Sequence, residues 1–392
     1  MYMSQPNCDL LVFSHLRWDF IYQRPQHIMA RQAQHRRVFF FEEPLFDEDQ
    51  YPQLQIQKMG KNLNIIVPHL PQGTKPANIV SHLRSLVDQA IDSCKLYEYS
   101  AWYYTPMAWP YTQHLRPLKI IYDCMDELSL FHGAPPHLLS LESELFHYAH
   151  LVYTGGVSLY EHKKLRHRNI HPIPSSIDMA HFRQARMQLH RCADQDHIPH
   201  PRIGFYGVID ERMDIDLVKE LAQLSPDYHF VLIGPVVKID PKILPQGPNI
   251  HYLGPKSYQE LPLYVSGWDC AFMPFARNNS TKFISPTKTP EFLAAGKPVV
   301  STAIDDVVHP YYDLSLIYIA NEASQFRSCL VKAMAEKSVD QDWQIRVDHF
   351  LAQNSWDKTF NRMAQLEESL YLRPQKDKSS AHALPLKLGT VS

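Results

Sequence analysis

The segment that begins at Ser285 contains residue types that suit binding of a nucleoside diphosphate. Its sequence predicts a loop, a short helix capped by Thr287 or Thr289 with Pro290 in the first turn, and then a buried strand. A helix start of this kind presents unpaired backbone N–H groups to phosphate oxygens, and Lys288 adds a positive charge. Glu291 lies one turn further along, where its carboxylate can accept hydrogen bonds from two ribose hydroxyls. The alternative is an ordinary helix–strand connection with a surface lysine.

A second phosphate-binding signal follows the predicted strand at residues 202–206. Gly207 lies just past this strand, where the missing side chain lets backbone approach a phosphate, and Arg212 follows close to the next helix. The alternative is a tight turn with Arg212 in a surface ion pair. Asp214 and Asp216 match the DxD pattern of metal-dependent transferases, but Asp214 directly precedes a helical pattern, so we interpret it as a helix cap.

The N-terminal part of the chain concentrates side chains that suit sugar recognition. Its first predicted strand, residues 9–13, is followed by a loop rich in aromatic and charged residues. An aromatic ring can stack on a sugar while polar groups fix its orientation. The candidate acceptor-binding residues are His15, Arg17, Trp18 and Arg24.

Two aspartates follow the predicted strand at residues 119–122, at the strand end that would face a cleft. Asp123 or Asp126 could orient an acceptor hydroxyl or accept its proton. Helix capping explains one of them equally well. Arg212 and Lys288 could neutralise the charge of a departing nucleoside diphosphate, so these four residues are the candidate catalytic groups.

Two motifs resemble those of a known family. The segment from Ser285, Ser-Pro-Thr-Lys-Thr-Pro-Glu-Phe-Leu-Ala-Ala-Gly-Lys-Pro-Val-Val-Ser-Thr, resembles the donor-binding motif of GT-B glycosyltransferases of the group 1, family 4-like type. The run Trp-Asp-Phe-Ile-Tyr-Gln-Arg-Pro-Gln-His from Trp18 is similar to one in a bacterial subset associated with exopolysaccharide and cell-wall polymer assembly. One position departs from the family pattern, because Phe283 stands where many retaining members carry a glutamate.

The resemblance covers nearly the whole chain to about residue 372 and implies a metal-independent hexosyltransferase. It implies that Glu291 binds the donor ribose, that Lys288 faces the phosphates, and that the loop at Gly207 meets the diphosphate. Ser285, Thr287 and Arg212 complete the expected donor site. The expected partners are a nucleotide-diphosphate sugar, as co-substrate with no further cofactor, and a sugar or lipid-linked acceptor. Because Phe283 replaces the glutamate of many retaining members, both retention and inversion of the configuration at the sugar's anomeric carbon stay open.

Other functions remain open at this stage. A nucleotide-sugar epimerase of the same fold would need no acceptor, and a non-catalytic sugar-nucleotide-binding scaffold is compatible with Phe283. A nicotinamide or flavin oxidoreductase is disfavoured, because no GxGxxG motif follows a predicted strand.

Strand and helix patterns alternate along both halves of the chain, which predicts parallel sheets covered by helices on both faces. The predicted fold class is α/β, with two Rossmann-like doubly wound domains that face each other across a cleft, and the resemblance implies that this fold is of the GT-B type. The resemblance adds that a C-terminal helix crosses back. The predicted strands are residues 9–13, 37–41, 64–67, 101–104, 119–122 and 151–153, then 202–206, 229–233, 249–253, 269–273, 298–300 and 316–319. The predicted divisions are an acceptor domain (1–175), a proline-containing linker (176–201), a donor domain (202–340), C-terminal helices that pack back toward the first domain (341–372) and a disordered tail (373–392).

Composition limits the class of protein. The chain has 392 residues, of which 45% are apolar and 20% charged, as in a soluble globular protein. Its net charge of -2 gives no overall electrostatic attraction for nucleic acid. The six cysteines are scattered and form no CxxC pair, which predicts a reducing cytoplasm. The 22 histidines lack the spacing of metal ligands, so no metal site is predicted. No signal-peptide pattern or membrane-spanning apolar run is expected. The basic helix end at residues 161–168 could dock on lipid head groups at the inner membrane face, and the alternative is a solvated helix end.

Overall fold

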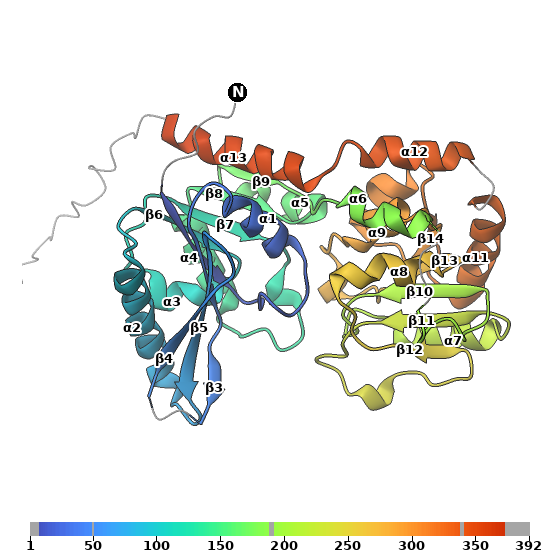
Figure 1. The fold of residues 1–392 in the computed structure, drawn as a ribbon, viewed down its shortest axis with the longest axis horizontal. Coiled ribbons are helices and arrows are strands. Elements are labelled where there is room, and N and C mark those ends of the chain that lie inside the picture. Colours follow the sequence, from blue (N-terminus) through green and yellow to red (C-terminus); the bar gives the residue numbers. More distant parts are fainter. Residues whose placement is uncertain (1–7, 49–50, 188–191, 338–340, 373–392) are drawn as a thin grey trace, which may run out of the picture.

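The computed structural model describes residues 8–48, 51–187, 192–337 and 341–372. These residues form two α/β domains that lie side by side, each built around one mainly parallel sheet (Figure 1). The predicted disordered tail at residues 373–392 lies outside the described residues.

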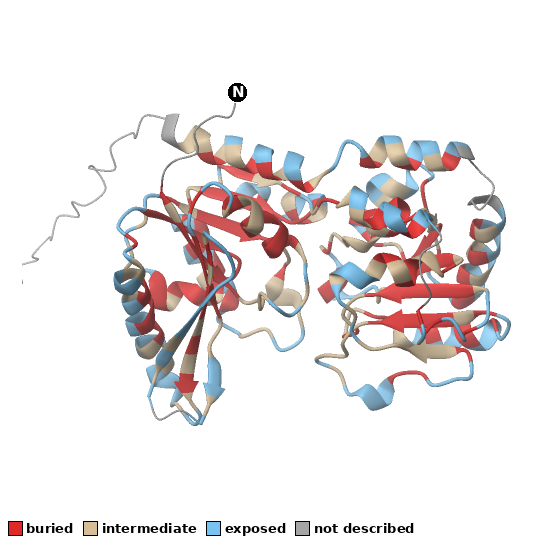
Figure 2. Cartoon of the chain, in the orientation of Figure 1, coloured by how far each residue is buried: buried red, intermediate tan, exposed pale blue. Residues whose placement is uncertain are grey.

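The first sheet has the strand order β3-β5-β2-β1-β6-β7-β8-β9, and β4 pairs antiparallel with β5. Its central strands are continuous apolar runs because helices cover both faces, and they are coloured as buried in Figure 2. The strands are β1 (Asp9–Ser14), β2 (Val38–Glu42), β3 (Leu45–Asp47), β4 (Gln53–Lys58), β5 (Leu63–Pro71), β6 (Tyr99–Tyr103), β7 (Ile120–Cys124), β8 (Leu151–Thr154) and β9 (Ile170–Pro172).

Helices of the first domain pack on both faces of this sheet. One apolar cluster includes Leu86 of α2 and Leu145 of α4, while the cluster on the other face includes Met29 of α1 and Met363 of the distant helix α13. The helices are α1 (Arg24–Gln32), α2 (Pro76–Cys94), α3 (Trp109–Thr112), α4 (Leu138–Tyr148) and α5 (Val157–Lys163).

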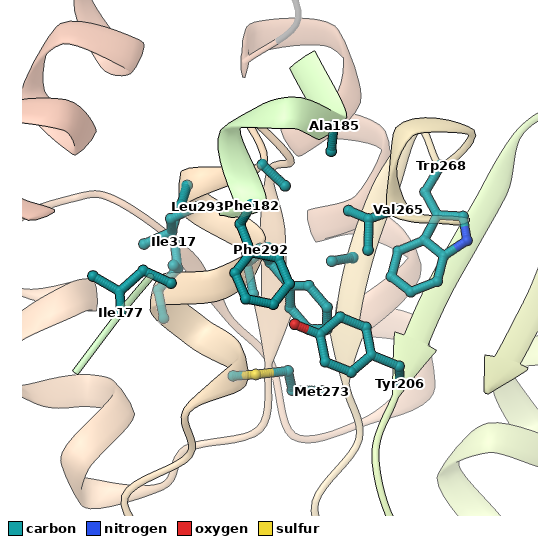
Figure 3. Packing of buried hydrophobic residues seen from close by; sticks show 14 of the residues in the cluster. Ile177, Phe182, Ala185, Tyr206, Val265, Trp268, Met273, Phe292, Leu293 and Ile317 are labelled. Carbon is teal, nitrogen blue, oxygen red and sulfur yellow. The ribbon is translucent and has the colours of Figure 1, made fainter. Parts of the chain in front are cut away.

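The second sheet has the order β12-β11-β10-β13-β14-β15 and is parallel throughout. One face packs against α7 and α11, and the other against α6, α8, α9 and α12. Figure 3 shows this second core, in which Tyr206 lies among Phe182, Phe292 and Trp268. The elements are α6 (Met179–Arg183), β10 (Arg202–Tyr206), α7 (Ile215–Leu224), β11 (His229–Ile233), β12 (Ile250–Tyr252), α8 (Leu261–Ser266), β13 (Cys270–Met273), α9 (Lys288–Ala294), β14 (Val299–Ser301), α10 (Asp305–Val307), β15 (Tyr318–Ile319), α11 (Ala323–Lys337), α12 (Gln341–Leu351) and α13 (Trp356–Leu372).

The C-terminal helix crosses back to the first domain, as predicted. Figure 1 shows α12 over the second domain and α13 over the first. The Tyr153 hydroxyl of β8 donates to the Met363 carbonyl at 3.0 Å. Arg36 and Glu367 form a buried ion pair at 2.8 Å, which fixes α13 against the first domain. The segment formed by α12 and α13 is therefore attached to both domains and links them a second time.

Sequence patterns located the buried strands better than the exposed ones. The predicted strands at 202–206 and 229–233 coincide with β10 and β11. The exposed strands β3 and β4 were missed, because a solvated edge strand such as Gln-Leu-Gln-Ile-Gln-Lys has no buried apolar run. Residues 176–201, predicted as the linker, include α6, whose Phe182 side chain is buried in the second core.

Candidate active site

A cavity of about 630 Å³ lies between the carboxyl ends of the two sheets. Ligands of open α/β sheets bind at this edge, because the loops that follow the strands converge there. The first domain lines it with residues 18–24, 27, 125, 126, 155 and 175; the second with residues 205–208, 212, 233–235, 255–259, 261, 275, 284–288 and 291; and the crossing helix with residue 356.

Glu291 projects from the first turn of α9, and its Oε2 accepts a hydrogen bond from the Tyr206 hydroxyl at 2.5 Å. Tyr206 ends β10, so two neighbouring strand-end segments meet at this carboxyl. Burial raises the pKa of Glu291, although the nearby Lys288 ammonium opposes that shift. A partly buried carboxyl held in one orientation is suited to bind a hydroxyl pair.

Lys288 begins α9, and its Nζ donates to Thr287 Oγ1 at 3.2 Å. Burial lowers the pKa of Lys288. Gly207 lies against the same side chain: a Cβ placed on this glycine would be 3.3 Å from Lys288 Cε, and its φ of +150° is one that side chains rarely adopt. The backbone of Gly207 and the lysine ammonium are therefore close enough to bind one phosphate group. Thr287 occupies the N-cap position, but its side chain makes no capping bond.

Arg212 lines the same cavity and is held by Asp210, with Nη2 to Oδ2 at 2.6 Å and Nε to Oδ1 at 2.9 Å. Its guanidinium carbon lies 5.6 Å from the centre of the Phe131 ring, which belongs to the first domain. The capping interpretation of Asp214 is confirmed, because its Oδ1 accepts from the Leu217 N–H at 2.9 Å at the start of α7.

Asp126 lines the cavity from the first domain, as Asp19 also does. Burial raises its pKa, while Arg212, Arg24 and Lys288 act in the opposite direction. These electrostatic effects come from both domains, so Asp126 faces the cations that Arg212 and Lys288 contribute. The arrangement places a proton acceptor across the cavity from groups that can bind an anion.

Asp123 lies elsewhere and corrects one expectation. Its two carboxylate oxygens accept from Arg24 Nη2 at 2.8 Å and Arg24 Nε at 3.1 Å, and the aspartate is fully buried. Asp123 does not line the cavity, although Arg24 does. Asp123 therefore orients Arg24 and is not placed to accept a proton from an acceptor. Sequence proximity to Asp126 gave no sign of this, because Asp123 lies within β7 and Asp126 lies in the loop that follows the strand.

The residues of the loop after β1 also differ in whether they line the cavity. Trp18 lines the cavity, whereas Arg17 is turned away to form an ion pair with Glu42 at 2.9 Å. Glu42 also accepts from the Trp18 N–H at 2.7 Å, so this pair holds the loop on β2. His15 also lies outside the cavity lining, and burial together with Lys238 lowers its pKa to about 4. Arg17 and His15 therefore do not line the cavity.

Several lining residues escaped the sequence analysis. Tyr258 stacks on His181 at 4.3 Å and packs on Tyr22 at 4.9 Å, and His27 stacks on Trp356 at 4.4 Å. These rings come from both domains and from the crossing helix, so no local pattern could group them. Tyr206 had a usable signal, because it directly precedes Gly207 at a predicted strand end.

The basic helix end at residues 161–168 is neither a free cationic patch nor simply solvated. Lys163 is fully buried, and its Nζ lies 2.7 Å from Glu142 and 2.6 Å from Glu127. Arg166 pairs with the same Glu142 at 2.5 Å. Two of its cations are therefore committed to internal carboxylates. Within the described part of the chain, no helix is long and apolar enough to cross a membrane, and no group of three or more His, Cys, Asp or Glu residues could hold a metal ion.

Comparison with known proteins identifies one curated relative and many similar structures. No family model matches the chain. Over 103 residues the chain is 36% identical to the putative teichuronic acid biosynthesis glycosyltransferase TuaH of Bacillus subtilis (strain 168), a match that spans 26% of this chain and 26% of TuaH. The match thus covers about a quarter of the relative's length.

The similar structures cover almost the whole chain. Sucrose-phosphate synthase from Thermosynechococcus elongatus has a TM-score of 0.70 at 14% identity over 93% of this chain and 100% of that one. Anabaena HepE in complex with UDP and glucose has a TM-score of 0.63 at 12% identity, over 92% and 99%. An E. coli trehalose-6-phosphate structure bound with UDP-2-fluoro glucose has a TM-score of 0.64 at 11% identity, over 92% and 99%. At such identities these likenesses establish the fold alone.

Proposed function

Since the chain has the predicted GT-B fold, we propose that it is a glycosyltransferase that moves a sugar from a nucleoside-diphosphate sugar to an acceptor hydroxyl. One observation carries the proposal: Lys288, Arg212 and Glu291 line a cavity of about 630 Å³ opposite Asp126 and Trp18. The local identity to TuaH, whose description is that of a glycosyltransferase, supports the same reaction class.

In the proposed donor complex, Glu291 accepts hydrogen bonds from the ribose hydroxyls, and Tyr206 holds its carboxyl in place. The diphosphate lies against Gly207, Lys288 and Arg212, with Ser285 and Thr287 at the same wall. When the bond from the sugar to the diphosphate breaks, negative charge accumulates on the leaving phosphate oxygens. Lys288 and Arg212 stabilise that charge without reorganising, because Asp210 and Thr287 already hold them. We therefore propose that transfer needs no metal and no separate cofactor.

On the acceptor side, we propose that Asp126 accepts the proton of the attacking hydroxyl. Burial raises its pKa, which makes its carboxylate a better base than an exposed one. Trp18 offers a ring for stacking on a sugar, and Arg24, anchored by Asp123, offers a fixed guanidinium. Closure of the two domains around both substrates excludes water and so limits hydrolysis of the donor.

The donor site is tested by thermal denaturation with UDP, GDP, ADP, CDP and dTDP, first without metal and then with magnesium. A ligand at a hundredfold excess over its dissociation constant raises stability by about 2.7 kcal/mol. UDP is expected to give the largest shift, because HepE is described in complex with UDP and glucose. A shift without metal that Glu291→Ala removes supports the proposal. If no nucleotide shifts the folded protein, the proposed donor site is wrong.

Transfer itself is tested by incubating the protein with the sugar form of the nucleotide that binds. We expect nucleotide release that rises when saccharide acceptors are added. Conversion of the donor sugar without any acceptor would instead identify an epimerase, and binding without release under any acceptor would identify a binding protein.

We infer that the reaction belongs to polysaccharide or glycolipid assembly and takes place in the cytoplasm. We also propose that the transferred sugar is a hexose. The support is the name of TuaH and the motif that begins at Trp18. Contact with the membrane through residues 161–168 is not part of the proposal, because Lys163 and Arg166 are paired with buried carboxylates.

A further inference from the structure

Helix α5 of the first domain begins against a carboxylate of the second domain. The N–H groups of Val157 and Ser158 donate to Asp306 Oδ2 at 3.0 Å and Asp306 Oδ1 at 2.8 Å. Asp306 belongs to α10 and is 8% exposed. An acidic side chain at a helix start satisfies otherwise unpaired N–H groups, so each domain stabilises the other here.

Gly156 makes this approach possible. A Cβ on Gly156 would lie 2.1 Å from Asp306 Oδ2 and 2.8 Å from the Cβ of Ser285. The neighbouring Gly155 is equally confined on its other side, since a Cβ there would lie 2.1 Å from the carbonyl oxygen of Met125. The glycine pair therefore fits between the second domain and the backbone that leads to Asp126.

The far end of α5 touches the second domain again. The His162 ring stacks on Phe283 with ring centres 4.4 Å apart and an interplanar angle of 20°. Phe283 packs against the apolar core of the first domain. The residue that stands in place of a family glutamate is thus turned out of its own domain and onto α5.

The same helix end holds the loop that carries Asp126. Lys163 Nζ lies 2.6 Å from Glu127 Oε2, and His162 Nε2 lies 3.6 Å from the same oxygen. Ser129 Oγ donates to the other oxygen of Glu127 at 2.7 Å. Glu127 directly follows Asp126 in the chain, so a shift of α5 displaces the cavity carboxyl.

We propose that Asp306 and Phe283 are positioning residues: through their contacts with α5, they fix Asp126 relative to Lys288 and Arg212. Neither side chain touches the reacting atoms in this scheme. The effect of Asp306 and Phe283 on catalysis rests on the proposed transferase function. Their effect on the position of the loop around Asp126 does not depend on that function. Docking of the two domains is then coupled to the position of the acceptor base.

The structural part is tested by hydrogen exchange on the full chain, comparing wild type, Asp306→Ala and Phe283→Ala. The diagnostic segment is residues 124–131, which lies outside the hydrogen bonds that Asp306 accepts from Val157 and Ser158. We expect its amides to exchange at least about 5-fold faster in both variants, in line with the usual strength of coupling between two sites. Asp305→Asn is the control, because this neighbouring aspartate is exposed. Thermal denaturation of each variant establishes that it is folded.

Faster exchange only at residues 157 and 158 would mean that Asp306 is a local helix cap, and would overturn the proposal. Unchanged exchange at residues 124–131 in folded Phe283→Ala would overturn it equally. These readouts need no substrate, so they remain decisive if the chain proves to have no transferase activity.

The catalytic part is tested by steady-state kinetics with the donor identified by denaturation. Asp306→Ala is expected to lower kcat about 10-fold while the nucleotide dissociation constant changes less than about 2-fold, because the donor contacts lie within the second domain. Asp305→Asn is expected to behave as wild type. A loss of nucleotide affinity equal to the loss of kcat would show that Asp306 supports the donor site itself, and would refute the positioning role.

Discussion

The cavity lining of the second domain, here called the donor wall, and that of the first domain, here called the acceptor wall, differ in how far the sequence indicated their residues. On the donor wall, all six residues that the sequence analysis named line the cavity: Gly207, Arg212, Ser285, Thr287, Lys288 and Glu291. On the acceptor wall, Trp18, Arg24 and Asp126 line it, whereas His15, Arg17 and Asp123 do not. Most of the donor residues follow one another within a single loop and helix. On the acceptor wall, some charged residues pair with residues distant in sequence. Asp123, for example, pairs with Arg24, which is 99 positions away.

The largest effect should separate the two aspartates of the acceptor wall. Asp123→Ala leaves the buried Arg24 guanidinium without its carboxylate, so we expect a loss of about 3–5 kcal/mol in the free energy of unfolding. Asp126→Ala, the matched control, should change that free energy by less than about 1 kcal/mol and yet abolish most transfer. Urea denaturation and nucleotide release measure the two effects. Equal stability losses in the two variants would contradict the division of roles.

The donor wall is tested by removing its central cation. Lys288→Ala should lower kcat by about 10²–10³-fold, as does removal of one group that stabilises transition-state charge. Lys219→Ala on α7 is the control, since this lysine is exposed and distant from the lining residues. Steady-state kinetics with saturating donor decide the matter. An unchanged kcat would place the leaving-group charge elsewhere in the cavity.

Acid should destabilise the first domain through His15, which lies outside the cavity lining. Its pKa is lowered to about 4 from 6.5, so the unfolded chain binds more protons between these values. The folded state is therefore unaffected by this group above pH 6.5 and loses stability as pH falls toward 4, by up to about 3 kcal/mol. In His15→Gln, urea denaturation at pH 7 and pH 4.5 should show a smaller decline than in wild type. His349→Gln, at an exposed histidine of α12, should decline as wild type does. A parallel decline in His15→Gln would show that His15 is protonated freely in the folded state.

The smallest effect concerns support of the donor wall by Tyr206. Tyr206→Phe removes the hydroxyl that donates to Glu291 while it keeps the ring packed on Phe292. One hydrogen bond contributes about 0.5–1.5 kcal/mol, so nucleotide affinity should fall between about 2-fold and 10-fold. Isothermal titration calorimetry measures it. A loss as large as that of Glu291→Ala would mean that the tyrosine itself binds the nucleotide.

The fold class was readable from the sequence because its signal is repeated and local. Apolar runs such as residues 202–206 and 229–233, separated by helical patterns, predict buried parallel strands, and β10 and β11 have those bounds. The resemblance carried by the segment from Ser285 then indicated GT-B, which the structural likenesses confirm. The edge strands β3 and β4 lack that signal, because their side chains face solvent.

By itself, the sequence determined the alternating elements, the loop and helix that begin at Ser285 and the cap at Asp214, because each depends on residues within a few positions of one another. Tertiary structure alone decided which charged groups reach the cavity. Arg17 reaches Glu42, Asp123 reaches Arg24, Lys163 reaches Glu127, and Asp306 reaches the start of α5. A charge removed from water must find an opposite charge or a hydrogen bond, and the partner that satisfies it is set by the three-dimensional arrangement of the strands and not by spacing along the chain.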